Sequence, residues 1–184
     1  MASNTTTTKA NGRHWVFDTL PLIYDDDCDV LILGTIPGAK SRAKGAYYAD
    51  PNNKFWKVID SNLSPMPHNT IDEQREYLLA NHIALWDVCF ACNMIGSANS
   101  TIRDIIPNHL CALLKHSNIK YVLFNGKEAE DMFGVLKCRP CCCNNKSKAV
   151  KFITLPSTSG ANNANWNKLE GDAQWAAALK NRRP

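Results

Sequence analysis

The chain has 184 residues, of which 45% are hydrophobic and 21% are charged. This composition predicts one globular domain with a substantial core and excludes an intrinsically disordered chain. No apolar run approaches the roughly 20 residues of a membrane-spanning helix, so we expect no membrane partner. The polar N-terminus lacks the apolar segment of a secretory signal, which predicts an intracellular protein of the nucleus or cytoplasm.

The formal net charge of +4 favours anionic partners only weakly. Scattered, solvated lysines explain this total equally well. The position of the bases is more informative, because Lys40, Arg42, Lys44 and Lys54 gather beside an aromatic segment. A phosphate backbone is the partner that such a cluster favours.

In chain order, residues 1–13 read as a polar, threonine-rich disordered tail and residues 14–184 as a single domain. Four short apolar runs then stand out, at residues 30–33, 83–86, 121–124 and 150–153. The first three are almost continuously apolar, which is typical of central strands covered on both faces.

Helical patterns fill the intervals between these runs. We expect helices that open at 55–59, cover 72–79, follow Pro107, cover 127–136 and cover 165–179. Thr70 and Glu73 form a capping-box pattern at the second helix, and Asn108 is a candidate N-cap for the third. This alternation of strands and helices predicts a three-layer α/β/α sandwich around a central four-stranded parallel sheet.

Ligands gather at the carboxyl ends of the strands in such a sheet. Those ends are residues 34–37, Asp87, residues 125–126 and residues 156–159, and they should lie on one rim. The long segment after the first run adds four aromatic residues, at positions 47, 48, 55 and 56. A connecting loop needs glycine, proline and polar residues but has no use for aromatic rings, so the segment is a candidate surface for a flat ligand.

Eight cysteines include two C-x-x-C pairs, Cys89 with Cys92 and Cys138 with Cys141. A four-cysteine zinc or iron–sulfur site is conceivable, but the gap between the pairs is longer than that of a zinc ribbon. The first pair lies in the apolar segment WDVCFACNM, where buried free thiols are common. We favour free thiols and expect neither a metal nor another cofactor.

Six segments carry a family resemblance: GTIPG, YYADPNNKFW, ALWDV, GSANSTIRD, VLFNG and LPSTSGAN. Together and in this order they resemble the hypoxanthine-DNA glycosylase branch of the uracil-DNA glycosylase superfamily. The resemblance implies a metal-free α/β/α fold with a four-stranded parallel sheet. It also implies that the chain removes damaged bases, deoxyinosine in this branch, by cutting the N-glycosidic bond.

The family's residues can be transferred to this chain one by one. Several branches place asparagine in the first motif to position a water, where this chain has Ile36; the hypoxanthine branch is also apolar there. Its catalytic asparagine, in Asn-x-Phe-Trp, falls on Asn53, and its base-stacking aromatic residue falls on Tyr48. Three positions depart from the common pattern, namely Asp50, Asn99 and Gly160.

A base must be flipped out of the duplex before it can be cut. We expect Tyr48 to stack on it, or else to pack in the core. Asp87 would accept from the N1–H of hypoxanthine; a strand-end aspartate that caps the next loop is an equal alternative. The first motif, Gly34, Thr35, Ile36 and Pro37, would complete the base pocket. Asn53 would orient a water, although a turn or helix cap is the common role of asparagine.

Two polar or basic segments are expected to contact the phosphate backbone of DNA. The candidates are Lys40, Ser41 and Lys44 in the first, and Ser157, Thr158, Ser159 and Asn162 in the second. A polar loop that caps the last helix is the alternative for the second segment. The small residues at 96–100 suggest a further loop that lines the pocket or faces DNA.

No lysine is placed for Schiff-base chemistry, so we expect a monofunctional, monomeric glycosylase that leaves an abasic site. DNA with deaminated bases is the expected partner. The alternatives are a uracil or mismatch glycosylase on the same scaffold, a damaged-DNA-binding protein without catalysis, and a cysteine-based metal or redox module.

Overall fold

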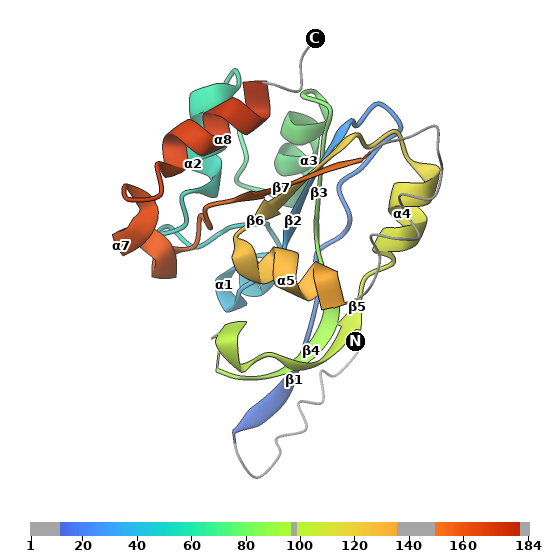
Figure 1. Ribbon diagram of the computed structural model, residues 1–184, viewed down its shortest axis with the longest axis vertical. Coiled ribbons are helices and arrows are strands. Elements are labelled where there is room, and N and C mark those ends of the chain that lie inside the picture. Colours follow the sequence, from blue (N-terminus) through green and yellow to red (C-terminus); the bar gives the residue numbers. More distant parts are fainter. Residues whose placement is uncertain (1–11, 97–98, 136–149, 181–184) are drawn as a thin grey trace.

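The computed structural model describes residues 12–96, 99–135 and 150–180, which form two β-sheets and the helices around them (Figure 1). The larger sheet has the strand order β3-β2-β6-β7 and is parallel throughout. Its strands are β2 (Val30–Gly34), β3 (Ile83–Asp87), β6 (Tyr121–Asn125) and β7 (Lys151–Leu155). The predicted four-stranded parallel sheet is therefore confirmed.

Both faces of this sheet are covered, because side chains that alternate along each strand enter two separate cores. Leu31 and Leu33 pack in one hydrophobic cluster, and Val30 and Ile32 pack in the other. The helices α4 (Leu110–His116) and α5 (Lys127–Val135) cover the first face. The helices α2 (Phe55–Asn62), α3 (Ile71–Leu79) and α8 (Gly171–Lys180) cover the second. Figure 1 shows the resulting three layers.

A second sheet was not predicted from the sequence. It is antiparallel, with the order β1-β4-β5, and contains β1 (Arg13–Phe17), β4 (Cys89–Ile95) and β5 (Arg103–Pro107). Because Val88 alone separates β3 from β4, this sheet starts at the carboxyl edge of the larger one and extends beyond it (Figure 1). One of its faces, with Val16, Cys92 and Met94, packs into the first core.

The predicted helix over 165–179 is wrong, since the chain breaks it into α7 (Asn163–Trp166) and α8. The backbone φ of Glu170 is +48°, which an α-helix cannot contain. The next residue, Gly171, packs against the ring of Trp166, and a Cβ there would lie 2.4 Å from it. The tryptophan ring thus occupies the space that a continuous helix would need for a side chain.

Two predicted helix caps have different outcomes. The capping box is confirmed, because the Thr70 hydroxyl accepts a hydrogen bond from the Glu73 amide and the Glu73 carboxylate accepts one from the Thr70 amide, both at 3.2 Å. The Asn108 cap is wrong, since α4 begins at Leu110 with His109 as its N-cap residue. Asn108 instead donates from its side-chain amide to the Asp87 carbonyl at 2.9 Å.

Short helical segments complete the described chain: α1 (Ala39–Lys44), η1 (Asn99–Thr101) and η2 (Gly160–Asn162). Among the described residues, no helix has the length and apolar character needed to cross a bilayer. Residues 1–11 of the expected tail lie outside the described part of the chain, and Arg13 already belongs to β1.

Candidate active site

The end of strand β2 leaves room for two functional groups because it is glycine. A Cβ at Gly34 would lie 2.3 Å from Oδ1 of Asp87 and 3.1 Å from the hydroxyl oxygen of Tyr48. Gly34 and Asp87 are also register partners at the ends of β2 and β3. The carboxyl group of Asp87 and the phenol of Tyr48 therefore meet over bare backbone, and three of the residues assigned to base binding lie together.

The other three residues of the first motif lie beneath this junction. Ile36 is 7% exposed and packs in the first core, and Thr35 and Pro37 are buried as well. The Thr35 carbonyl accepts a hydrogen bond from the Cys89 amide, and the Pro37 carbonyl accepts one from the guanidinium of Arg42. The assignment of these three residues to the base pocket stays a prediction, and in the free protein they are buried beside Gly34.

Asp87 is 4% exposed, and its Oδ2 has no hydrogen-bond partner among the described residues. Burial, and secondarily the charge of Asp18, raises the pKa of Asp87 well above its usual range. Asp87 is bonded through its backbone carbonyl to Asn108, whereas its carboxyl group makes no bond to the following loop. Capping of that loop therefore does not account for an aspartate at position 87. A buried carboxyl oxygen without a hydrogen-bond partner needs another explanation, such as a bound ligand.

Tyr48 has a backbone φ of +51°, a conformation that is uncommon outside glycine. Its ring stacks on Phe55 with the centroids 4.0 Å apart. Its hydroxyl is buried near the side chain of Asn125, without a hydrogen bond of normal geometry to a described residue. Burial, together with the charge of Asp87, raises the pKa of Tyr48. Tyr48 is therefore partly exposed as a residue, although its hydroxyl is buried. This combination differs both from a core aromatic residue and from a fully exposed one.

The backbone before Tyr48 is held by Gln74 of α3, a residue that the sequence analysis missed. The buried Gln74 side chain accepts from the Tyr47 amide at 2.7 Å and donates to the Tyr47 carbonyl at 3.0 Å. The indole N–H of Trp56 donates to the same carbonyl at 2.9 Å. The sequence could have indicated this role only through a polar residue near the apolar face of the helix. Its partner, the backbone of Tyr47, is 27 residues away in sequence, so no local pattern links the two.

Asn53 follows this loop and begins the approach to α2. Its side-chain oxygen accepts a hydrogen bond from the Phe55 amide at 2.9 Å, so the expected turn or cap role of asparagine is present. The backbone amide of Asn53 donates to the Asp50 carbonyl at 2.9 Å. Because a carbonyl oxygen has two lone pairs, this cap leaves one acceptor position on Asn53.

The loop after β7 packs directly against the Asn53 loop. The Lys54 amide donates to the Thr158 carbonyl at 2.8 Å, and a Cβ on Gly160 would lie 2.9 Å from Cβ of Asn52. Thr158 is fully buried and exchanges two hydrogen bonds of 2.8 Å with the side chain of Asn125. Thr158 therefore holds the loop against the end of β6. Its contact with DNA stays a prediction, and in the free protein its side chain is already bonded to Asn125.

The other polar residues of this loop stabilise its turns. The Ser157 hydroxyl accepts from the Ser159 amide at 3.3 Å, and the Ser159 hydroxyl accepts from the Ala161 amide at 3.3 Å. The Asn162 side chain donates to the Ser157 carbonyl at 3.0 Å. Ser157, Ser159 and Asn162 remain partly exposed, so they stay available for the contacts with phosphates that we predict.

The basic segment on α1 divides into three different environments. Lys40 forms an ion pair of 3.0 Å with Asp50, and both side chains are largely exposed. Ser41 is buried, and its hydroxyl accepts from the Ala49 amide at 3.2 Å, so its DNA contact stays a prediction. Lys44 is exposed beside the aromatic loop and lines a pocket.

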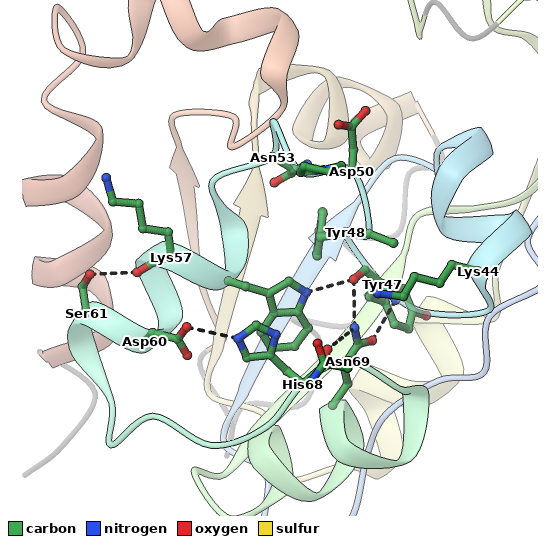
Figure 2. Close-up of a pocket in the computed structure, with 14 residues that line it drawn as sticks. Lys44, Tyr47, Tyr48, Asp50, Asn53, Lys57, Asp60, Ser61, His68 and Asn69 are labelled. Atoms are coloured by element: carbon green, nitrogen blue, oxygen red, sulfur yellow. Dashed lines mark hydrogen bonds and ion pairs between the residues drawn. The ribbon is translucent and has the colours of Figure 1, made fainter.

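That pocket has a volume of about 600 Å³ and opens beside the Tyr48–Asn53 loop (Figure 2). Tyr48, Asn53 and Lys44 line it, together with Trp56 and His68, whose rings stack 4.5 Å apart. Of the predicted site residues, those at the ends of β3 and β7 do not line it. The pocket thus flanks the junction over Gly34 and does not join the four strand ends in one cavity.

Comparison with known proteins identifies the family. A model of the uracil DNA glycosylase superfamily matches residues 21–180. The chain belongs to this superfamily. It is therefore a DNA glycosylase, a hydrolase of N-glycosidic bonds, and the parallel sheet with its carboxyl-edge loops is the glycosylase fold.

Individual relatives come from methanogenic archaea. The chain is 32% identical over 162 residues to a protein named hypoxanthine DNA glycosylase from Methanosarcina barkeri, covering 87% of this chain and 96% of the relative. A protein of the same name from Methanosarcina acetivorans is 30% identical over 165 residues, with the same coverage. The solution structure of a candidate uracil DNA glycosylase from M. acetivorans matches with a TM-score of 0.70 at 27% identity, covering 88% of this chain and 95% of that one.

The first cysteine pair of the glycosylase lies in β4, and Cys89 and Cys92 are both buried free thiols, as we expected. Cys138 and Cys141, the other half of the conceivable metal site, lie outside the described residues. Within residues 12–96, 99–135 and 150–180, no three histidine, cysteine or acidic side chains are grouped as metal ligands would be.

Proposed function

We propose that this glycosylase flips out and excises hypoxanthine from deoxyinosine by hydrolysis and leaves an abasic site. The observation that carries the proposal is the buried, unpaired carboxyl oxygen of Asp87 beneath Tyr48 at the end of β3. A buried polar atom without a partner is costly, so it is expected where a ligand supplies the missing hydrogen bond. The names of the two archaeal relatives support the choice of hypoxanthine.

Asp87 would read the base through the hydrogen on N1. Hypoxanthine presents an N1–H donor, which matches an acceptor oxygen on Asp87. Adenine has no hydrogen on N1, so its ring nitrogen and an oxygen of the ionised Asp87 carboxylate would be two acceptors face to face. A site with a buried acceptor rejects such a base strongly. The stacking of the flipped base on Tyr48 would contribute about 1–3 kcal/mol to binding.

Asn53 would position the attacking water. Its side-chain oxygen is held by the Phe55 amide, which fixes the amide plane and leaves the second lone pair for a water. An amide is a poor proton acceptor, so Asn53 would orient the water more than deprotonate it. Stabilisation of the departing base must then provide much of the reduction in activation free energy. Lys44, Ser157, Ser159 and Asn162 would contact the flanking phosphates.

Uracil is the second candidate substrate, and the same observation favours it. Its N3–H is a donor next to a carbonyl, as N1–H is in hypoxanthine, and Asp87 could accept from either. The apolar Ile36, where other branches have a water-positioning asparagine, argues for weaker activity on uracil.

The decisive test is single-turnover cleavage of duplexes with one inosine, uracil or xanthine, followed by alkaline scission of the abasic product. We expect Asn53→Ala to slow inosine cleavage by about 100-fold and Asp87→Ala to reduce cleavage more than DNA binding. Asn52→Ala is the matched control, because this neighbouring side chain is exposed and should leave the rate unchanged. Equal cutting by the parent and by Asn53→Ala would refute the mechanism; DNA binding without scission by the parent would indicate a damage-binding protein.

A further inference from the structure

The second sheet has one face that no element of the described chain covers. Seven large hydrophobic residues of the described chain are exposed, and four of them belong to this sheet. Those four are Phe17 (50% exposed), Phe90 (46%), Ile95 (40%) and Ile106 (46%). Exposed apolar residues that occur singly are ordinary, whereas a group on one element marks an interaction site.

Strand register places these residues on the same side. Arg13 pairs with Ile95, Trp15 pairs with Asn93, and Phe17 pairs with Ala91. Paired residues of antiparallel strands point to the same face, and alternate residues point to the other. Since Val16, which alternates with them, is buried in the core, Trp15 and Phe17 point outward.

Strand β5 continues the rows. Arg103 pairs with Asn93 in the row of Trp15, and Ile106 pairs with Ala91 in the row of Phe17, with an irregularity between the two pairs. Arg103 and Ile106 are both exposed, whereas Ile105 packs against the first core. The outer sheet face therefore consists of Arg13, Trp15, Phe17, Ile95, Arg103 and Ile106. Phe90 alternates with Ala91 and lies outside these rows, but it is exposed and its ring meets Phe17 edge-on at a centroid distance of 6.4 Å, so we include it in the face.

The charges on this face are anchored. The guanidinium of Arg13 donates to the Thr101 carbonyl at 2.9 Å, and that of Arg103 donates to the Ile102 carbonyl at 2.6 Å. Each guanidinium thus uses some of its N–H donors on backbone carbonyls. Carbonyl oxygens carry no net charge, so the positive charge of each arginine remains. Asp104 lies beside the face, where it accepts from the Asn93 side chain at 3.3 Å, so two cations face one carboxylate.

We propose that the outer sheet face binds single-stranded DNA. Three aromatic rings offer platforms for unstacked bases, and two anchored guanidinium groups match phosphates. A duplex hides the faces of its bases in the stack, so it would make only the charge contacts. The face begins close to the candidate site, because Phe90 is three residues from Asp87, a distance of roughly 10 Å along a strand. In taking DNA as the ligand the proposal rests on the proposed function.

The test uses the full chain and undamaged DNA, so that it does not depend on cleavage. Fluorescence anisotropy would measure the binding of a labelled oligothymidine and of a matched duplex. We expect Phe17→Ser/Phe90→Ser to weaken oligothymidine binding about tenfold or more, and Phe17→Tyr to retain it because the ring remains. Met66→Ser is the matched control, an exposed apolar residue in the loop between α2 and α3. Arg13→Gln should reduce the salt dependence by about 0.7 per lost phosphate contact.

Several results would overturn the proposal. Equal oligothymidine affinity in the parent and in Phe17→Ser/Phe90→Ser is the first. A parent dimer in sedimentation velocity that this double variant dissociates, with unchanged affinity for oligothymidine, would show that a second copy covers the face. The single variants replace the double variant if it does not fold.

The two proposals can fail separately. Oligothymidine binding that depends on Phe17 and Phe90, in a protein that cuts no inosine, would retain the sheet proposal and remove the proposed substrate. Inosine cleavage that depends on Asn53, with oligothymidine binding insensitive to the sheet variants, would do the reverse.

Discussion

At the scale of single residues, the candidate site depends on the absence of a side chain at Gly34. Any other residue would place a Cβ 2.3 Å from the Asp87 carboxyl, so the absence of a side chain lets two enclosed groups approach each other. Neither Tyr48 nor Asp87 satisfies its buried polar atom within the described chain. Both residues thus reduce stability in the free protein, a cost that is common where a ligand binds.

The raised pKa of Asp87 predicts how stability depends on pH. The unfolded chain releases this proton near the ordinary pKa of 3.8, whereas the folded chain keeps it to higher pH. The folded state therefore binds more protons, and stability falls as pH rises from about 3.8 until the folded pKa is passed. Asp87→Asn removes this effect, so its thermal stability relative to the parent should increase as pH rises above about 4.

Thermal unfolding at several pH values would check this expectation. Asp27→Asn serves as the control, because Asp27 is an exposed aspartate that precedes the amino end of β2, whereas Asp87 lies at the carboxyl end of β3. A stability difference between Asp87→Asn and the parent that stays constant with pH would contradict it.

At the scale of elements, α3 positions the aromatic loop although it lies on the other side of α2 in the chain. Gln74 bonds both the amide and the carbonyl of Tyr47, and Trp56 of α2 shares the carbonyl. These bonds hold the peptide just before Tyr48, where φ is positive. Two helices that the sequence presents only as core-forming therefore determine the conformation of the candidate base platform.

Gln74→Met should expose this dependence, because methionine fills a similar volume without hydrogen bonds. We expect a loss of about 1–3 kcal/mol in unfolding free energy, from the unpaired Tyr47 amide. We also expect inosine cleavage to slow at saturating enzyme while the affinity for undamaged duplex stays constant. Urea unfolding and single-turnover kinetics would measure the two effects, with the exposed Arg75→Met on the same helix as the control. A normal cleavage rate with reduced stability would limit Gln74 to a purely structural role.

At the scale of the whole molecule, the larger sheet separates two cores that meet at every central strand. Ile32 and Leu33 are neighbours in β2, both fully buried, yet they contribute to opposite clusters. We expect Ile32→Ala and Leu33→Ala each to cost about 2–5 kcal/mol of unfolding free energy, because neither face is exposed to solvent. Urea unfolding would measure both losses, and the exposed Lys57→Ala should leave stability nearly unchanged. If only one of the two variants lost little unfolding free energy, the core on that side of the sheet would be loosely packed.

Local patterns account for what could be read from the sequence. The near-continuous apolar runs indicated buried parallel strands, and the Thr70–Glu73 spacing indicated a capping box, because neighbouring residues suffice for both signals. The same patterns failed where side-chain contacts intervened. The Trp166 ring packs against Gly171 and displaces a continuous last helix. Asn108 binds Asp87 and Asp18 instead of capping α4. Strand β4 pairs with β1, which lies far before it in the chain, and with β5, which follows it closely.

The sequence by itself determined the layer architecture, the strand ends that form the rim and the family motifs, since these follow from short-range periodicity and from the order of segments. Only the tertiary structure decided which rim residues are buried with hydrogen-bond partners and which keep unpaired polar atoms. Ile36, Ser41 and Thr158 turn inward, whereas Asp87 and Tyr48 meet over Gly34 with unpaired atoms. Burial and hydrogen-bond partners are properties of contacts between distant segments, so no local pattern of residues could reveal them.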